Sequence, residues 1–151
     1  MGRLKGIPTI ISPELLHVLA CMGHGDEIVF ADANFPTSNI CRQGPREVRA
    51  DGHEIPQLLA AVLQLMPLDR HVPYRAVVMA VLEDDVKKGF PATMPVWKKY
   101  CEEIKKAGDE PLLYEEERFQ FYERAKKAYA VVHTGETSLY GNIILKMGVI
   151  P

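Results

Sequence analysis

The apolar run AVVMAVL, at residues 76–82, is the feature that most restricts how this chain can fold. Seven apolar residues in succession favour a strand whose two faces are both buried, because alternate side chains of a strand point to opposite faces of a sheet. The run is far shorter than the roughly 18 apolar residues that a membrane-spanning helix needs. A sheet buried on both faces requires helices on each side, so the sequence must also supply helices.

Strand-like and helix-like segments alternate along the whole chain. The further strand candidates are Glu27–Asp32, Arg46–Ala50, Leu112–Tyr114, Ala130–Thr134 and Ile143–Met147. The helix candidates are a segment that begins at Ser12 and Pro13 and ends at Gly23, followed by Ile55–Met66, Pro95–Ala107 and Arg118–Lys127; Ala33–Pro45 is predicted to be a long loop. This alternation predicts one α/β domain over residues 1–151, with a mostly parallel sheet and helices on both faces.

The charge and cysteine content exclude several classes of function. The 18 basic and 20 acidic residues give a formal net charge of −2, which is too small and too evenly spread for a nucleic-acid-binding surface. No membrane-spanning run or secretory leader is recognisable, so we expect a cytoplasmic protein. The three cysteines, Cys21, Cys41 and Cys101, are widely spaced, which favours buried, reduced thiols over disulfides or a zinc site.

A histidine between two glycines, in the sequence MGHGD at residues 22–26, is the first candidate for chemistry. The glycines leave the ring of His24 little covered, and the negative end of the preceding helix favours its protonated form. Both features suit a proton donor, although a histidine in an ordinary polar turn has the same pattern. The Gly-x-Gly lacks a third glycine and precedes a strand, so it does not predict a nucleotide-binding loop.

Polar residues at predicted strand ends and turns are the other candidates. Asp32 ends the first strand candidate, where ligands bind in parallel sheets, and its carboxylate can accept hydrogen bonds from hydroxyl groups or cap the loop. Tyr140 and Asn142 flank a glycine between two strands; they can face one cavity, or the amide can simply cap a turn. Arg118 offers a fork of donors to an oxygen-rich ligand, with a surface salt bridge as the alternative. Most of the aromatic residues of segment 117–129 are expected in the core.

Two long segments resemble the ribose pyranase and L-fucose mutarotase family, in particular its animal branch. They are SPELLHVLACMGHGDEIVFADANFP near the start and RFQFYERAKKAYAVVHTGETSLYGNIILKMGV near the end; the resemblance covers the whole chain and is weakest at 87–114. It implies an isomerase that interconverts the anomers of a reducing sugar, L-fucose, with His24 as proton donor and Tyr140 as a second catalytic residue. It also implies homo-oligomers with sites near subunit boundaries. The implied substrate contacts are Asp32, Asp69, Arg118, Gln120, Tyr140 and Asn142.

Anomer exchange, alone or with pyranose–furanose interconversion, requires only an acid and a base. The ring opens to the aldehyde, one bond rotates and the ring closes again, so we expect no cofactor and no metal. Each positioned proton transfer contributes about 10²–10⁴-fold. The base is left open between Tyr140, Asp32 and water. Two rival hypotheses are a non-catalytic sugar-binding or regulatory module, and a metal-assisted aldolase or isomerase in which His24, Asp26 and Asp32 bind a divalent ion.

Overall fold

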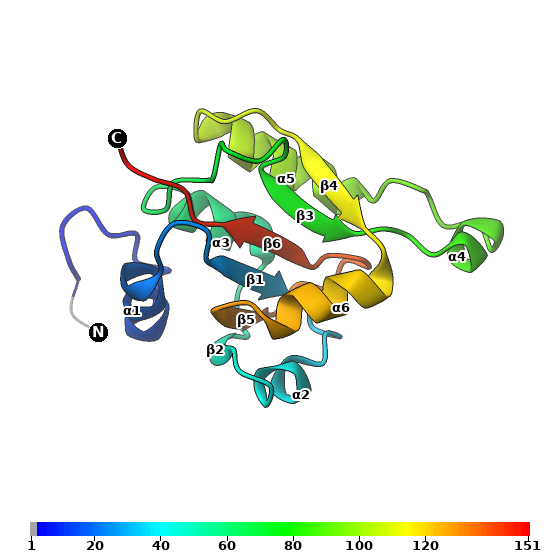
Figure 1. Cartoon of the computed structure of the whole chain (residues 1–151), viewed down its shortest axis with the longest axis horizontal. Helices are drawn as coiled ribbons and strands as arrows, with labels where there is room; N and C mark the ends of the chain where they lie inside the picture. The colour runs from blue at the N-terminus through cyan, green and yellow to red at the C-terminus, as the bar shows by residue number, and fades with distance from the viewer. Residues whose placement is uncertain (1–2) are drawn as a thin grey trace.

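A six-stranded sheet forms the centre of the molecule (Figure 1). The computed structural model describes residues 3–151. The strands are β1 (Glu27–Ala31), β2 (Arg46–Ala50), β3 (Ala76–Met79), β4 (Leu113–Glu116), β5 (Ala130–Thr134) and β6 (Ile143–Lys146). Their order is β2-β5-β1-β6-β3-β4. All neighbours are parallel except β6, which runs antiparallel to both β1 and β3, so the predicted mostly parallel sheet is confirmed.

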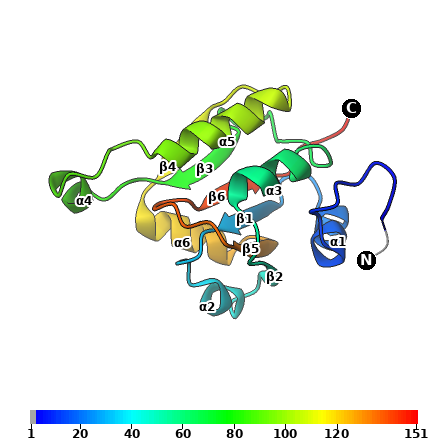
Figure 2. The same cartoon turned by 180° about the vertical axis from the view of Figure 1, so that it is seen from behind.

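Helices cover both faces of this sheet, as predicted. They are α1 (Pro13–Cys21), α2 (Thr37–Cys41), α3 (Ile55–Val62), α4 (Glu83–Lys87), α5 (Pro95–Lys106) and α6 (Arg118–Lys126). Helix α6 crosses the face turned to the viewer in Figure 1, whereas α3 and α5 lie on the opposite face, which Figure 2 shows in front. Helix α4 lies at the end of a long excursion away from the sheet in both views. Within residues 3–151, no helix combines the length and apolarity needed to cross a membrane.

Strand β1 divides its side chains between two apolar clusters. Ile28 and Phe30 are fully buried in the cluster that also contains residues of α1, α3 and α5. Val29 and Ala31 are equally buried in the second cluster, which contains residues of α2 and α6. This alternation with a period of two is what a strand buried on both faces requires. The two ends of β1 are therefore the places where it can present polar groups.

Three predicted boundaries are wrong. The predicted loop 33–45 contains α2, because Thr37 and Ile40 are buried on the inner face of that short helix. The helix predicted over Ile55–Met66 ends at Val62. The strand predicted over residues 76–82 ends at Met79, and the chain then leaves the sheet to form α4.

One prediction about burial is also wrong. The predicted buried thiols are free, but Cys21 is exposed and the other two are only partly buried. Among the aromatic residues of segment 117–129, most of which were expected in the core, Phe119 is an exception and is 71% exposed. Phe121 and Ala125, four positions apart on one face of α6, fill the core instead. The helical turn of α6 thus points Phe121 into the core and Phe119, two residues earlier, towards solvent.

A partly buried ion pair holds α6 against the sheet. Arg124 donates to both carboxylate oxygens of Glu27 at 2.7–3.1 Å and to the hydroxyl of Tyr74 at 2.8 Å. Burial alone would lower the pKa of Arg124, but its hydrogen bonds to Glu27 and Tyr74 raise it above the ordinary value. The pair therefore stays ionised and holds α6 in register with the start of β1.

Candidate active site

The candidate residues gather in two separate places, one at each end of β1. His24 lies three residues before the strand, and Asp32 follows its last residue. Five strand residues span roughly 16 Å, at about 3.3 Å each. The two groups therefore lie too far apart within one chain to contact the same small ligand together.

The turn that carries His24 is fixed by the end of β6. The amide of Gly25 donates to the carbonyl of Met147 at 2.9 Å, and the amide of Met147 donates to the carbonyl of Asp26 at 2.8 Å. The Asp26 side chain turns back and accepts from the amide of Gly23 at 2.8 Å. The side chain of His24 remains 47% exposed, as the flanking glycines predict.

The other side of the same strand end holds the segment that carries Asp69. Its amide donates to the carbonyl of Lys146 at 3.0 Å, and the amide of Gly148 donates to the carbonyl of Pro67 at 2.8 Å. Leu68 and Met147 form an isolated antiparallel bridge. The backbone of residues 146–148 thus lies between the His24 turn and the Asp69 loop, which are 45 residues apart in sequence, and bonds to both.

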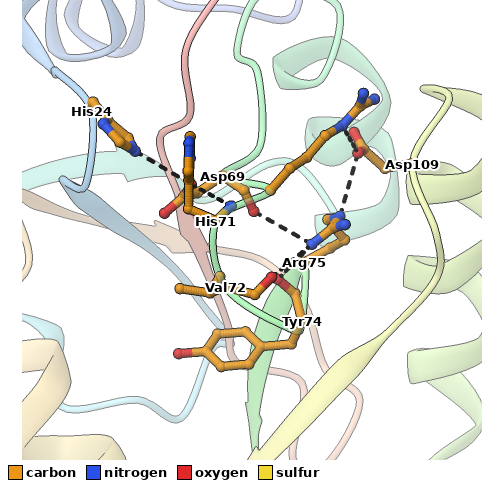
Figure 3. Close-up of polar contacts among 8 residues, drawn as sticks. His24, Asp69, His71, Val72, Tyr74, Arg75 and Asp109 are labelled. Carbon is orange, nitrogen blue, oxygen red and sulfur yellow. Dashed lines mark hydrogen bonds and ion pairs between the residues drawn. The ribbon is translucent and has the colours of Figure 1, made fainter.

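Two imidazoles share one oxygen of the buried Asp69 carboxylate (Figure 3). The Nε2 atom of His24 lies 3.3 Å from Asp69 Oδ1, and the Nδ1 atom of His71 lies 3.1 Å from it. The amide of His71 also donates to this oxygen, at 3.0 Å. Burial acts to raise the pKa of Asp69, but the hydrogen bonds from His71 and His24 outweigh it and hold the pKa below its ordinary value. Asp69 is therefore a carboxylate near neutral pH. We call these three residues the His24 cluster.

Arg75 fixes the loop on which this carboxylate lies (Figure 3). Its Nη1 atom donates to the carbonyls of Val72 and Tyr74, both at 3.1 Å, and lies 3.5 Å from the carbonyl of Asp69. Its Nε atom forms an ion pair with Asp109 at 3.4 Å. The side chains of Arg75 and Asp109 are 12% and 9% exposed, so this support is largely buried. The Asp69 loop is therefore held from both sides.

The second place is a cavity of about 220 Å³ at the carboxyl end of β1. Its polar lining residues are Asp32, Asn34, Asp85, Arg118, Tyr122, Tyr140 and Asn142. A larger hollow of about 450 Å³ borders His71, but neither His24 nor Asp69 lines it, so size does not identify the site. We call the smaller space the Asp32 cavity.

Asp32 and Asn142 are bonded to backbone as well as facing the cavity. Asn142 Oδ1 accepts from the amide of Asp32 at 2.7 Å. The Asp32 carboxylate accepts from the amides of Asn34 at 3.0 Å and Gly141 at 3.3 Å. Burial raises the pKa of Asp32, although these amides favour its charged form. The capping role that the sequence left open is present, and it fixes the carboxylate in the cavity.

Tyr140 has a hydrogen-bond partner that the sequence did not predict. Its hydroxyl donates a short hydrogen bond to Asp85 of α4 and accepts one from the amide of Leu82 at 3.2 Å. Burial and the hydrogen bond to Asp85 both raise the pKa of Tyr140, so the phenol keeps its proton near neutral pH. The only sequence signal for this contact is the acidic run at 83–85, which suits a helix start but does not indicate a tertiary partner.

The remaining sequence candidates differ in their placement. Arg118 lines the Asp32 cavity, and its guanidinium lies 5.7 Å from the centre of the Tyr122 ring. Gln120 is exposed on α6 and is not among the lining residues. The metal set considered from sequence, His24, Asp26 and Asp32, is divided between the two ends of β1.

The comparisons with known proteins cover nearly the full chain. A family model described as the RbsD / FucU transport protein family matches residues 5–150. The fucose mutarotase of Danio rerio is 58% identical over 151 residues, which are 100% of this chain and 97% of the relative. The fucose mutarotase of Mus musculus is 59% identical over 150 residues, 99% of this chain and 97% of that protein. A crystal structure of the fucose mutarotase of Streptococcus pneumoniae in complex with L-fucose superposes with a TM-score of 0.88 and 46% identity, covering 98% of this chain and 100% of the other.

Proposed function

Because the chain belongs to the RbsD / FucU transport protein family, we propose that residues 1–151 form one domain that acts as an L-fucose mutarotase, interconverting the α and β anomers. The single observation that carries the assignment to this chain's own residues is the His24–Asp69 pair, an exposed imidazole oriented by a buried carboxylate. Because the His24 cluster and the Asp32 cavity lie at opposite ends of β1, we assign a separate role to each end.

His24 is the acid. Asp69 accepts from Nε2, which leaves Nδ1 as the atom that exchanges protons with the sugar. In ring opening, Nδ1 gives a proton to the ring oxygen as the bond between that oxygen and the anomeric carbon breaks. The Asp69 carboxylate offsets the positive charge of the imidazolium from which this proton departs. Ring closure reverses each transfer, so no net proton is consumed.

We assign the opposite proton transfer to Tyr140 together with Asp85. As the ring opens, the anomeric hydroxyl loses its proton and becomes the aldehyde oxygen. The raised pKa of Tyr140 means that the phenol can take this proton only while it passes its own to Asp85, to which it already donates. Asp32, Arg118 and Asn142 then bind the other hydroxyl groups. Gln120 is exposed on α6 and does not line the cavity, so its role as a substrate contact stays a prediction.

The separation of the two groups supports a homo-oligomer in which sites form between copies. A sugar that lies in the Asp32 cavity of one subunit can meet only the His24 cluster of another, because β1 separates the two within a chain. The three free cysteines support a location in the reducing cytoplasm.

The test is exchange of the anomers of L-fucose, measured by magnetisation-transfer NMR. His24→Ala is expected to keep the fold and the sugar affinity but to lose at least 100-fold in exchange rate, within the range for one positioned proton transfer. His53→Ala, in another turn, is the matched control and should keep the wild-type rate. If His24→Ala exchanges normally, His24 is not the acid. If the wild-type protein binds fucose without accelerating exchange, the protein is a sugar-binding module instead.

Co-expression of two inactive variants tests the shared site. His24→Ala and Asp32→Ala each remove one half, so a random mixture contains intact sites in about one quarter of the pairings. Exchange should therefore recover to about one quarter of the wild-type rate in the mixture. If the site lies within one chain, the mixture stays as inactive as its components.

A further inference from the structure

We propose that the His24 cluster is a site for a borderline transition-metal cation, Zn²⁺ above all, and that occupation of this site switches off anomer exchange. The cluster combines two imidazole nitrogens and one carboxylate oxygen, and the three ligand atoms all lie within 4.8 Å of one another. The loss of exchange rests on the proposed function, whereas the metal site itself does not.

The distances fit a tetrahedral ion. Zinc bonds to nitrogen and oxygen at about 2.0–2.1 Å, which places two tetrahedral ligands about 3.3 Å apart. The distance from His24 Nε2 to Asp69 Oδ1 is 3.3 Å, and that from His71 Nδ1 to the same oxygen is 3.1 Å. Two edges of the tetrahedron are thus already formed. Closing the third requires only a rotation of an exposed imidazole, and both rings are partly exposed to solvent.

The kinds of ligand select the kind of cation. Two imidazoles and one carboxylate suit Zn²⁺, Co²⁺, Ni²⁺ and Cu²⁺, whereas Mg²⁺ and Ca²⁺ prefer sites made of oxygen ligands alone. The cluster supplies three protein ligands, so one tetrahedral position stays open for water.

The supports of the cluster favour binding. Asp69 is 6% exposed, and its loop is held by Arg75 through three backbone carbonyls. The His24 turn is held by the end of β6. Ligands fixed in this way lose little freedom when an ion binds, which increases affinity.

Zinc should inhibit anomer exchange because it binds the Nε2 atom of His24. A cation on Nε2 replaces the proton that His24 shares with Asp69, and the ring then cannot become the imidazolium that donates from Nδ1. A cation can also separate the cluster from the sugar, because it carries its own water on the open position. Both effects remove the acid without altering the Asp32 cavity.

Zinc binding is measured first, by competition with a chromophoric chelator and untagged protein. Cys21 Sγ lies 3.6 Å from His17 Nε2 and offers a competing pair of ligands, so every variant also carries Cys21→Ser. We expect one Zn²⁺ per chain. Removal of one ligand by His71→Ala should weaken binding at least tenfold, whereas His53→Ala should leave it unchanged. Equal affinity of the His71→Ala and His53→Ala proteins overturns the site.

Exchange of L-fucose anomers is then followed during a titration with Zn²⁺ and, separately, Mg²⁺. Each variant is compared with its own metal-free rate, so that a direct effect of the substitution is removed. Zn²⁺ should inhibit the Cys21→Ser protein, His71→Ala should require at least ten times more Zn²⁺, and Mg²⁺ should have no effect. Stoichiometric binding without inhibition overturns the switch. An absence of exchange in every metal-free protein, with His71-dependent binding intact, refutes the proposed function and leaves the metal site standing.

Discussion

Gly148→Ala tests whether the end of β6 positions the His24 cluster. A Cβ at this position would lie 2.6 Å from the carbonyl carbon of Leu68 and 2.9 Å from the amide nitrogen of Asp69. Carbon atoms in contact are normally about 3.5–4.0 Å apart, so the backbone must move by about 1 Å. Neither neighbour can rotate away, because both atoms belong to the main chain.

Two effects of different size follow. Overpacking of this kind costs about 1–3 kcal/mol, and in a domain of about 150 residues each kcal/mol lowers Tm by roughly 2–4 °C. A displacement of about 1 Å of a catalytic group costs about 100-fold in rate. Gly148→Ala should therefore lower Tm by at most about 12 °C while exchange of fucose anomers falls by about two orders of magnitude.

The assay compares thermal unfolding and anomer exchange at a temperature well below both melting points. Gly52→Ala is the matched control, since a Cβ at that position meets no atom within 4 Å. The control should retain both Tm and exchange rate. Wild-type exchange in a folded Gly148→Ala protein would refute the claim that this backbone contact positions Asp69 beside His24.

Three further predictions concern the cavity and the core. Tyr140→Phe removes the hydroxyl that bonds to α4 and should lower kcat by at least tenfold. Leu139→Ala, at a partly exposed neighbour that also lines the Asp32 cavity, should lower kcat less, and equal losses measured by NMR exchange would indicate a packing role. Burial raises the pKa of Asp32, so the contribution of Asp32 to the free energy of unfolding is complete below the ordinary aspartate pKa and is lost as pH rises through the raised pKa. Urea unfolding at several pH values should therefore show that the stability of Asp32→Asn depends less on pH than that of the wild type. An unchanged pH dependence contradicts this. Glu27→Gln weakens the ion pair with Arg124 and should lower the free energy of unfolding by about 1–3 kcal/mol, measured by urea titration, with no change indicating that the pair is neutral.

The strands and most helices could be predicted because their signals are local. Strand β1 has an unbroken apolar pattern, and the hydroxyl of Ser12 caps α1 by accepting from the amide of Leu15 at 3.1 Å. The antiparallel direction of β6 had no such signal. Its apolar run is equally compatible with both directions, and only the pairing with β1 and β3 settles the choice.

The candidate site could be predicted residue by residue but not as an arrangement. His24 and Asp32 were found because glycines and a strand end are visible in the sequence, but the sequence analysis still placed the two in one site. The pairing of His24 with Asp69 and that of Tyr140 with Asp85 were missed because these contacts join segments far apart in the chain. Contacts of this kind depend on sheet order and loop paths, which hydrophobic patterns do not specify.

The position of the His24 cluster and the Asp32 cavity at opposite ends of β1 has a consequence for the kinetics that the proposed shared site predicts. If the proposed site between two subunits forms, it is lost when a dimer dissociates, so the exchange rate of a very dilute solution should rise with the square of the protein concentration and become linear only above the dissociation constant. Dilution in a rate assay would thus report the strength of subunit association directly.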